Sequence, residues 1–506
     1  PETRAELRIL KPGEKWETSF TPFGMEGTNS ATLETSLLPS VNLGKRLGYL
    51  IEYPHGCTEQ IVSAAFPQIW LNEISAADTA GARKAQQNVI EAINGMVTRQ
   101  MNNGGLALWP GYYQPDNWVT SYAGHFMAEA ERKGYTIPQD FKRKWTSYQK
   151  RAAQDWRFDP KFLQTANDQA YRLFSLALAG SPERGAMNRL RESPDLPQVA
   201  RWLLAAAFAT SGRPEASSEL LDMRNLETEK EYSGYFYGSP LRDKSIILYT
   251  LATLKKEEEA LPLLRSVCDE LNSETWFSTQ SVAWGLFSYM KFAGLTSPGG
   301  TGEAGFRITQ NGQSSDLKVG PGRINTRILN TSAGTNNLVA ENLSDKPLYF
   351  NLVSLGTPLV SDQSAADNGL SLRVDYTDTG LKPVDQRNLV QGTDFMMVTK
   401  VTNTSFDRVD NIALTQMVPS GWEILNTRMF EADYGIKESP YEYRDIRDDR
   451  VNTYFSLNRG ESKTFVLILN AAYKGEYYQP AILCEAMYTS GYRSRVPGTR
   501  VVVRGQ

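Results

Sequence analysis

The sequence predicts a multi-domain protein of α and β structure, in which a helical region lies between two β regions. Its length of 506 residues suggests about three or four domains, because single hydrophobic cores stop growing at about 250–300 residues. The hydrophobic periodicity also changes twice along the chain. Strand-like alternation gives way to helical spacing near residue 38 and returns near residue 298, which separates the three regions.

Composition narrows the class of protein. Hydrophobic residues make up 41% of the chain and charged residues 22%, as in globular proteins with a buried core. The net charge of −3 gives no electrostatic basis for binding nucleic acid. No apolar run approaches the roughly 20 residues that span a bilayer. A signal-peptide pattern is absent, and a start at Pro1 is what we expect of a mature product or an excised fragment.

Residues 1–36 are predicted as β-strands and residues 38–296 as a helical repeat. The repeat consists of five similar apolar segments, at Asn117–Gly134, Thr165–Gly180, Val199–Gly212, Asp243–Leu254 and Trp276–Gly294. Four of them end at a glycine, which suits a helix C-cap. More polar segments between them, such as Ala82–Arg99 and Ile137–Gln154, are typical of outer helices. Alternating inner and outer helices predict an α/α solenoid or a closed α/α toroid.

Residues 298–506 are predicted as short strands joined by turns. The pair Asn311-Gly312 directly after an apolar stretch predicts a β-hairpin. Short strands with regular turns are typical of antiparallel sandwiches, and about 200 residues suffice for two such domains. We expect the break between the two near Ser361–Gly369.

The chemistry of the chain is predicted to lie at Cys57 and Gln60, which directly follow Pro54 and Gly56. In a tight turn the sulfur reaches the glutamine side-chain carbonyl, and attack by the thiolate with loss of ammonia closes a small thiolactone ring. Gly56 permits the required backbone geometry, and Pro54 fixes the approach to the turn. The product is a reactive acyl donor that a lysine amine, a hydroxyl or water discharges once.

The run Tyr53–Gln60 reads Tyr-Pro-His-Gly-Cys-Thr-Glu-Gln and resembles the thioester signature of the α2-macroglobulin and complement family. Its core, Gly-Cys-x-Glu-Gln, is complete, and the Tyr-Pro lead-in resembles bacterial members. The resemblance implies a reactive pair with supporting residues at Tyr53, Pro54, Gly56 and Glu59. Looser similarities to helix and strand segments of the family lie at Trp118–Tyr122, Glu485–Tyr488 and Arg493–Val503.

The resemblance also implies a domain order. Residues 1–36 and 298–365 are expected to form a β-sandwich CUB domain, and residues 37–297 a thioester domain, an α/α toroid, inserted within it. Residues 366–506 are expected to form a C-terminal macroglobulin or receptor-binding-like β-sandwich.

The function implied by the resemblance is that of a broad-spectrum protease inhibitor. In that family a protease cuts a bait segment, the molecule rearranges, and the exposed thioester tethers the protease through its lysine amines. The upstream macroglobulin domains and bait region of the same parent chain are then the other partners. We expect a monomeric, periplasmic or secreted protein, and a membrane-anchored lipoprotein stays open as an alternative for its parent. We expect a single-turnover trap rather than an enzyme, with no cofactor and no metal.

The two histidines, His55 and His125, bear on the choice of acceptor. Family members that prefer hydroxyl acceptors use a histidine well past the cysteine, and the corresponding stretch Tyr148–Thr165 contains none. His125 lies on an apolar helical face and is predicted to be a core residue. Whether the side chain of His55 can reach the thioester stays open. The sequence therefore predicts an amine-preferring thioester. Two histidines also exclude a His-rich metal site.

The remaining cysteines and aromatic residues are mostly predicted to pack in cores. Cys268 and Cys484 lie in helical and strand patterns, and three cysteines are too few for a disulfide framework. The resemblance implies that some aromatic side chains shield the thioester from water. The candidates are Trp109, Tyr112, Tyr113, Trp118, Tyr488 and Tyr492.

Three other functions remain open at this point. A cysteine hydrolase or transglutaminase would pair Cys57 with an oriented histidine. A polysaccharide-active α/α-toroid enzyme would use paired carboxylates. An inactive scaffold module would keep the fold with a hydrolysed thioester.

Overall fold

The computed structural model describes residues 2–53, 55–71, 79–221, 226, 237–296, 302–358, 365–425 and 436–505. The chain forms two compact units. Most of residues 2–358 belong to the first unit, and residues 365–505 belong to the second together with Tyr237 and Trp276–Ser278. The predicted break at Ser361–Gly369 therefore falls partly outside the described residues. Within the described ranges, no helix combines the length and apolarity that crossing a membrane requires.

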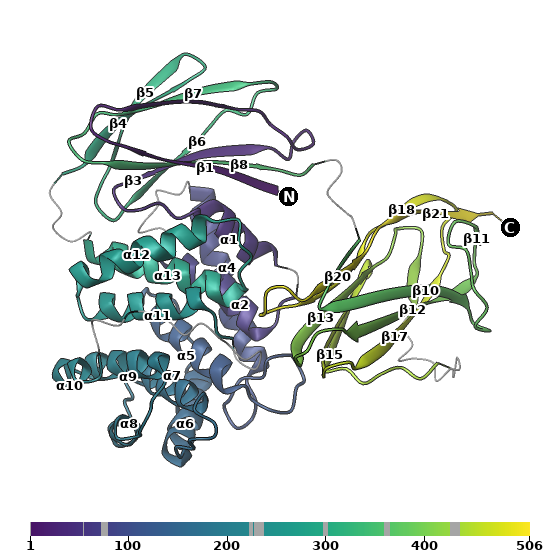
Figure 1. Ribbon diagram of the computed structural model, residues 1–506, viewed down its shortest axis with the longest axis horizontal. Helices are drawn as coiled ribbons and strands as arrows, with labels where there is room; N and C mark the ends of the chain where they lie inside the picture. Colours follow the sequence, from purple (N-terminus) through teal and green to yellow (C-terminus); the bar gives the residue numbers. More distant parts are fainter. Residues whose placement is uncertain are drawn as a thin grey trace. The chain divides into compact units, whose positions relative to one another are not determined.

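A β-sandwich in the first unit is built from the two ends of that unit's sequence (Figure 1). One sheet has the order β1-β8-β3-β6 and the other the order β2-β7-β4-β5. Phe306 of one sheet and Phe350 of the other pack ring against ring in the core between them, 5.8 Å apart. The strands are β1 (Glu2–Leu10), β2 (Lys15–Phe20), β3 (Ser30–Ser36), β4 (Ala304–Gln310), β5 (Gln313–Val319), β6 (Ile324–Ile328), β7 (Asn336–Asn342) and β8 (Leu348–Gly356).

The predicted hairpin at Asn311-Gly312 is confirmed, because both residues have positive φ (48° and 84°) between the paired strands β4 and β5. Two positive φ values in a two-residue loop match the right-handed twist of the strands.

The helices of the first unit lie between β3 and β4 in sequence. Six of them contact one another in a closed cycle, α2–α5–α7–α9–α11–α13 and back to α2. The helices are α1 (Leu43–Glu52), α2 (Thr58–Ala65), η1 (Pro67–Trp70), α4 (Thr79–Arg99), α5 (Asn117–Arg132), α6 (Gln139–Asp155), α7 (Thr165–Leu178), α8 (Arg184–Arg191), α9 (Gln198–Thr210), α10 (Pro214–Ser218), α11 (Pro240–Thr253), α12 (Glu257–Asn272) and α13 (Thr279–Thr296). All five predicted inner segments coincide with helices of this cycle, and the two outer segments coincide with α4 and α6.

Three of the four predicted glycine caps are confirmed. Gly134, Gly180 and Gly212 have φ between 73° and 88° and follow α5, α7 and α9. After each, the next backbone N–H donates to a carbonyl in the last helical turn, as in a Schellman motif. The prediction for Gly294 is wrong, because α13 continues through it to Thr296. Lys255 takes the left-handed conformation after α11 instead of a glycine (φ 59°).

Aromatic side chains fill the centre of the helical cycle. His125 on α5 is fully buried there, as predicted, and contacts the rings of Phe66 at the end of α2, Phe174 on α7 and Phe287 on α13. Its Nδ1 and Nε2 lie 3.1 Å from the hydroxyls of Tyr171 and Tyr249, respectively. Around His125, the interior of the cycle is therefore a packed core and not an open channel.

In the part of the second unit that the structure describes, all regular secondary structure is β. Its sheets have the orders β10-β12-β17-β14, β15-β16-β13-β19-β20-β9 and β11-β21-β18 around one apolar core, in which Cys484 is buried as predicted. The strands are β9 (Ala366–Asn368), β10 (Leu370–Asp378), β11 (Leu389–Val390), β12 (Asp394–Asn403), β13 (Val409–Met417), β14 (Glu423–Leu425), β15 (Tyr443–Ile446), β16 (Arg450–Leu457), β17 (Ser462–Asn470), β18 (Gly475–Gln479), β19 (Ile482–Ala486), β20 (Arg493–Val496) and β21 (Thr499–Arg504).

Glu34 joins the sandwich to the helices of the first unit. It is buried on β3, and its carboxylate accepts hydrogen bonds from the backbone N–H of Gly44 in α1 (3.3 Å) and from Nδ2 of Asn351 in β8 (3.1 Å). Burial raises the pKa of Glu34 from 4.5 to about 7, although both hydrogen bonds favour the charged form. The folded protein therefore holds this proton to a higher pH than the unfolded chain does.

We expect the contribution of Glu34 to the free energy of unfolding to be full below pH 4.5 and lost as pH rises through about 7. The folded state binds more protons than the unfolded state in this window, and the loss amounts to as much as about 3 kcal/mol. Urea unfolding of the wild type and Glu34→Gln at several pH values measures it. If the free energies of unfolding of the two proteins differ by a constant amount between pH 4.5 and about 7, the prediction is contradicted.

Candidate functional site

The candidate site lies in the turn that leads into α2. Gly56 has φ 70°, in the left-handed region, and Cys57 then turns the chain into the helix as its N-cap. The carbonyl oxygen of Gly56 accepts a hydrogen bond from the Arg99 guanidinium on α4 (3.2 Å). Pro54, which was predicted to support the turn, lies outside the described residues.

Cys57 and Gln60 face each other across the first turn of α2. The backbone N–H of Cys57 donates to Oε1 of Gln60 (3.1 Å), and the backbone N–H of Gln60 donates to the sulfur of Cys57. This reciprocal arrangement is a capping box. Cys57 is 0% and Gln60 3% exposed, so both side chains lie in a site that excludes bulk water.

Thr58 attaches this helix end to the loop that precedes α5. Its hydroxyl donates to the carbonyl oxygens of Ala107 (2.6 Å) and Leu108 (3.0 Å), and its backbone N–H donates to Leu108 as well (2.9 Å). Trp109, a predicted shielding residue, is the next residue in this loop and is buried.

Glu59 attaches the same turn to two neighbouring helices. Its Oε2 accepts from the Thr279 hydroxyl at the start of α13 (2.8 Å), and its Oε1 accepts from the Ser63 hydroxyl (2.5 Å). The Ser63 oxygen lies 3.0 Å from the hydroxyl of Tyr122 on α5. Burial, reinforced by the charge of Glu59, raises the pKa of Tyr122 well above its usual value. Tyr122 therefore keeps its proton and donates to Ser63, which donates to Glu59.

Sequence reasoning missed Ser63, Tyr122 and Thr279. Ser63 is four residues after Glu59, on the same helical face, which is a signal that could have been read. Thr279 is 220 residues away, and only the closed helical cycle brings it to the site.

The other aromatic candidates occupy different environments. Trp118 packs at the centre of the helical cycle, where its Nε1 donates to Oε1 of Gln280 (2.9 Å) and its ring contacts Tyr171. Tyr112 stacks on Tyr113, which is 77% exposed.

The last two candidates belong to the second unit. Tyr488 packs its ring against that of Tyr237, and Tyr492 packs against the core. Shielding by any of the six aromatic residues stays a prediction.

The two histidines differ in their environment. Burial lowers the pKa of His125 from 6.5 to about 3, so its ring is neutral at physiological pH. His55 is buried beside the site, where its ring packs edge-on against Tyr53. Tyr53 also contacts the ring of Tyr49 on α1.

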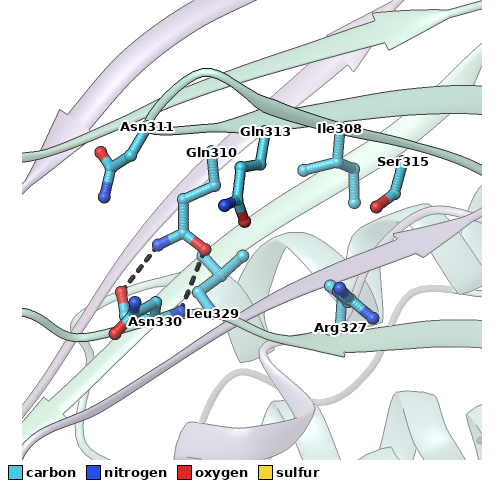
Figure 2. A pocket seen from close by; sticks show the side chains of 8 residues that line it. All are labelled: Ile308, Gln310, Asn311, Gln313, Ser315, Arg327, Leu329 and Asn330. Atoms are coloured by element: carbon cyan, nitrogen blue, oxygen red, sulfur yellow. Dashed lines mark hydrogen bonds between the residues drawn. The ribbon is translucent and has the colours of Figure 1, made fainter.

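A cavity of about 170 Å³ lies elsewhere, between the β4–β5 hairpin and β6. The amide of Gln310 exchanges hydrogen bonds with the backbone of Asn330 across it (Figure 2). None of the predicted site residues lines this cavity, and Arg327 is its ionisable side chain. It therefore lacks the paired groups that acid–base or nucleophilic catalysis needs.

Comparison with known proteins finds similarity along nearly the whole chain. Residues 369–490 match the family model described as the bacterial α2-macroglobulin MG10 domain. The chain is 26% identical to an α2-macroglobulin of Escherichia coli over 525 residues, which cover 96% of the chain and 30% of that protein. It therefore spans less than a third of the length of this relative.

Two solved structures share the fold. The crystal structure of native E. coli α2-macroglobulin from domain MG7 to the C-terminus matches with a TM-score of 0.80 and 22% identity, over 99% of this chain and 82% of that one. The structure of Salmonella α2-macroglobulin reacted with methylamine matches with a TM-score of 0.82 and 22% identity, over 99% of this chain and 33% of that one.

We expect Gly56→Ala to destabilise the protein by about 1–2 kcal/mol, because an L-residue is strained at positive φ. Gly27→Ala is a matched control, because Gly27 has φ 80° and, like Gly56, has open space where the added Cβ would lie. Urea unfolding should give similar losses for both if backbone strain is the whole effect, and a larger loss for Gly56→Ala if the capping box breaks too. Wild-type stability of Gly56→Ala contradicts the assigned turn.

Proposed function

Because this chain belongs to the bacterial α2-macroglobulin family, we propose that Cys57 and Gln60 form an internal thioester that tethers an attacking protease. The observation that carries the proposal is the reciprocal hydrogen bonding of these two residues at a buried helix end. The two hydrogen bonds hold the Cys57 thiol and the Gln60 carboxamide in one helical turn.

The chemistry has two steps. In the first, the sulfur of Cys57 bonds to the side-chain carbonyl carbon of Gln60, and ammonia leaves with the thiol proton. In the second, a lysine amine of the protease displaces the sulfur, an amide joins Gln60 to the protease, and Cys57 regains a proton. Because the acyl group is consumed, the chain acts once, as part of an inhibitor and not as an enzyme.

The proposal includes the domain names. We assign residues 37–297 to a thioester domain, an α/α toroid, because six helices contact in a closed cycle. We assign residues 1–36 and 298–365 to the interrupted CUB domain, because their strands interleave in the same two sheets. Residues 366–506 form the C-terminal macroglobulin-like sandwich, in which the MG10 match lies. The bait region and further macroglobulin domains belong to the parent protein, for which we propose a periplasmic or secreted location.

We propose that the thioester prefers amines. An acyl-imidazole route to hydroxyl acceptors needs a histidine that reaches Gln60. His125 is held between Tyr171 and Tyr249 in the core instead. His55 precedes the N-cap within the turn, and its ring packs on Tyr53.

Two enzyme alternatives find less support. A cysteine hydrolase needs an oriented histidine that can take a proton, and the pKa of about 3 for His125 makes it a poor base at neutral pH. One observation favours a carboxylate enzyme, since burial and the charge of Asp116 raise the pKa of Asp168 to about 7. However, Asp116 caps α5 by accepting from the N–H of Val119 (2.8 Å), which removes it as a free catalytic partner.

Intact-mass measurement separates the proposal from a scaffold with a hydrolysed bond. We expect freshly prepared protein to lie about 17 Da below the sequence mass, and methylamine to add to Gln60, because closure expels ammonia and an amine reopens the ring. Cys57→Ala should lose both effects. Cys268→Ala, which removes another buried cysteine, should keep both. An unshifted mass in the fresh wild type refutes the thioester.

Acceptor preference is measured by offering the protein labelled methylamine and labelled glycerol at equal concentration. We expect uptake of methylamine to exceed that of glycerol by tenfold or more, because the hydroxyl acceptor lacks the general acid–base assistance that supplies about 10²–10⁴-fold where it is present. Cys57→Ala reports the background. Efficient uptake of glycerol contradicts the amine preference.

A further inference from the structure

The cavity between the β4–β5 hairpin and β6 lies along one side of the sandwich. Strand β5 ends one of the two sheets and β6 ends the other. Side-chain amides join these two edges on either side of the cavity. The amide of Gln310 bonds twice to the backbone of Asn330 (2.7 and 3.0 Å), and Nδ2 of Asn325 donates to the carbonyl oxygen of Lys318 (3.1 Å). Contacts of the protein itself therefore set the spacing of the edges.

Three polar side chains face inward along this side. Ser315 on β5 is paired with Ile308, and Arg327 on β6 is paired with Leu33. Both partners lie in the core of the sandwich, and directly opposite residues of paired strands share one face of a sheet. Gln313 is two residues before Ser315 and takes the same face. All three side chains line the cavity (Figure 2).

These three side chains are uncommitted. Within the described residues, the structure gives the side chains of Gln313, Ser315 and Arg327 no hydrogen bond or ion pair. The neighbouring carboxylate of Asp316 points to the opposite face, where it is bound to Arg307 (2.6 Å). The residues that line the cavity are neutral apart from Arg327. The cavity thus offers one positive charge and several hydrogen-bond donors.

We propose that this cavity binds a carboxylate carried on a short aliphatic chain, such as the side chain of a glutamate. The guanidinium of Arg327 has the planar geometry that matches a carboxylate, and Ser315 and Gln313 add neutral donors. Ile308 and Leu329 are 4% and 5% exposed and form an apolar wall for the methylene groups. A cavity of about 150 Å³ holds benzene, so the about 170 Å³ found here suits a group of this size.

The proposal goes beyond the thioester and does not depend on it, because α2 contributes no residue to this cavity. An inward charge on an edge strand also opposes the association of sheet edges, and Arg327 alone would serve that purpose. Two observations favour binding. Gln313 and Ser315 are uncommitted as well, and the bonds of Gln310 and Asn325 fix the edges without Arg327.

Saturation-transfer NMR on the complete 506-residue chain measures weak binding of small probes. Propionate has the shape and charge of a glutamate side chain, and propionamide has the shape without the charge. We expect propionate to bind with a dissociation constant on the order of 1–10 mM, as a single exposed ion pair with neighbouring donors allows. Added salt should weaken this binding. Propionamide should bind at least about fivefold more weakly; equal binding of the two probes overturns the proposal.

Variants assign the binding to this cavity. Arg327→Met removes the charge and should weaken propionate binding by about fivefold or more. Arg327→Lys keeps the charge without the planar fork and should lose less. Arg323→Met is the matched control, because Arg323 directly precedes β6 but does not line the cavity, and it should stay within about twofold of the wild type.

Equal losses in Arg323→Met and Arg327→Met indicate a general effect of charge and overturn the proposal. Self-association of Arg327→Met with unchanged propionate binding also overturns it, because the arginine then only protects the sheet edge.

A capped Val-Glu-Val tripeptide distinguishes two sources of the carboxylate, with Val-Gln-Val as its uncharged control. An extended peptide adds main-chain hydrogen bonds to an edge strand. Binding of Val-Glu-Val about tenfold or more tighter than that of propionate therefore supports a glutamate of a polypeptide as the ligand. Binding no tighter than that of propionate supports a free small carboxylate. If neither propionate nor Val-Glu-Val binds, the carboxylate site is refuted, whatever the mass of the Cys57–Gln60 segment shows.

Discussion

The reciprocal hydrogen bonds between Cys57 and Gln60 are the interaction on which the site depends. A capping box normally satisfies the free N–H groups at a helix start. Here the two side chains involved are a thiol and a carboxamide, so an arrangement that stabilises the helix also holds these two groups in one turn. The left-handed turn at Gly56 allows this, because it lets the chain enter the helix with Cys57 at the N-cap.

The rest of the first unit holds this helix end in place. Thr58, Glu59 and the carbonyl of Gly56 are each bonded to a different neighbouring segment. The aromatic core around His125 joins the helices behind them. Hydrogen bonds of Gly56, Thr58 and Glu59 therefore fix the start of α2 to the segments around it.

Local features could be predicted from the sequence, and distant ones could not. The Asn311-Gly312 hairpin and the glycine caps at Gly134 and Gly180 follow from backbone preferences of the residues themselves. The prediction of a cap at Gly294 was wrong because a glycine is only a weak helix breaker when packing continues the helix. For the site, the spacing singled out Cys57 and Gln60 and the family resemblance singled out Glu59, whereas the partners of Glu59 required the closed cycle.

The 220-residue separation of Glu59 from Thr279 has a consequence for the order of events during synthesis. A growing chain contains Cys57 and Gln60 long before it contains α13, and contacts of such long range form late in folding. Until α13 docks, the carboxylate of Glu59 lacks its partner there. The turn that holds Cys57 and Gln60 thus reaches its final geometry only when the helical cycle is complete.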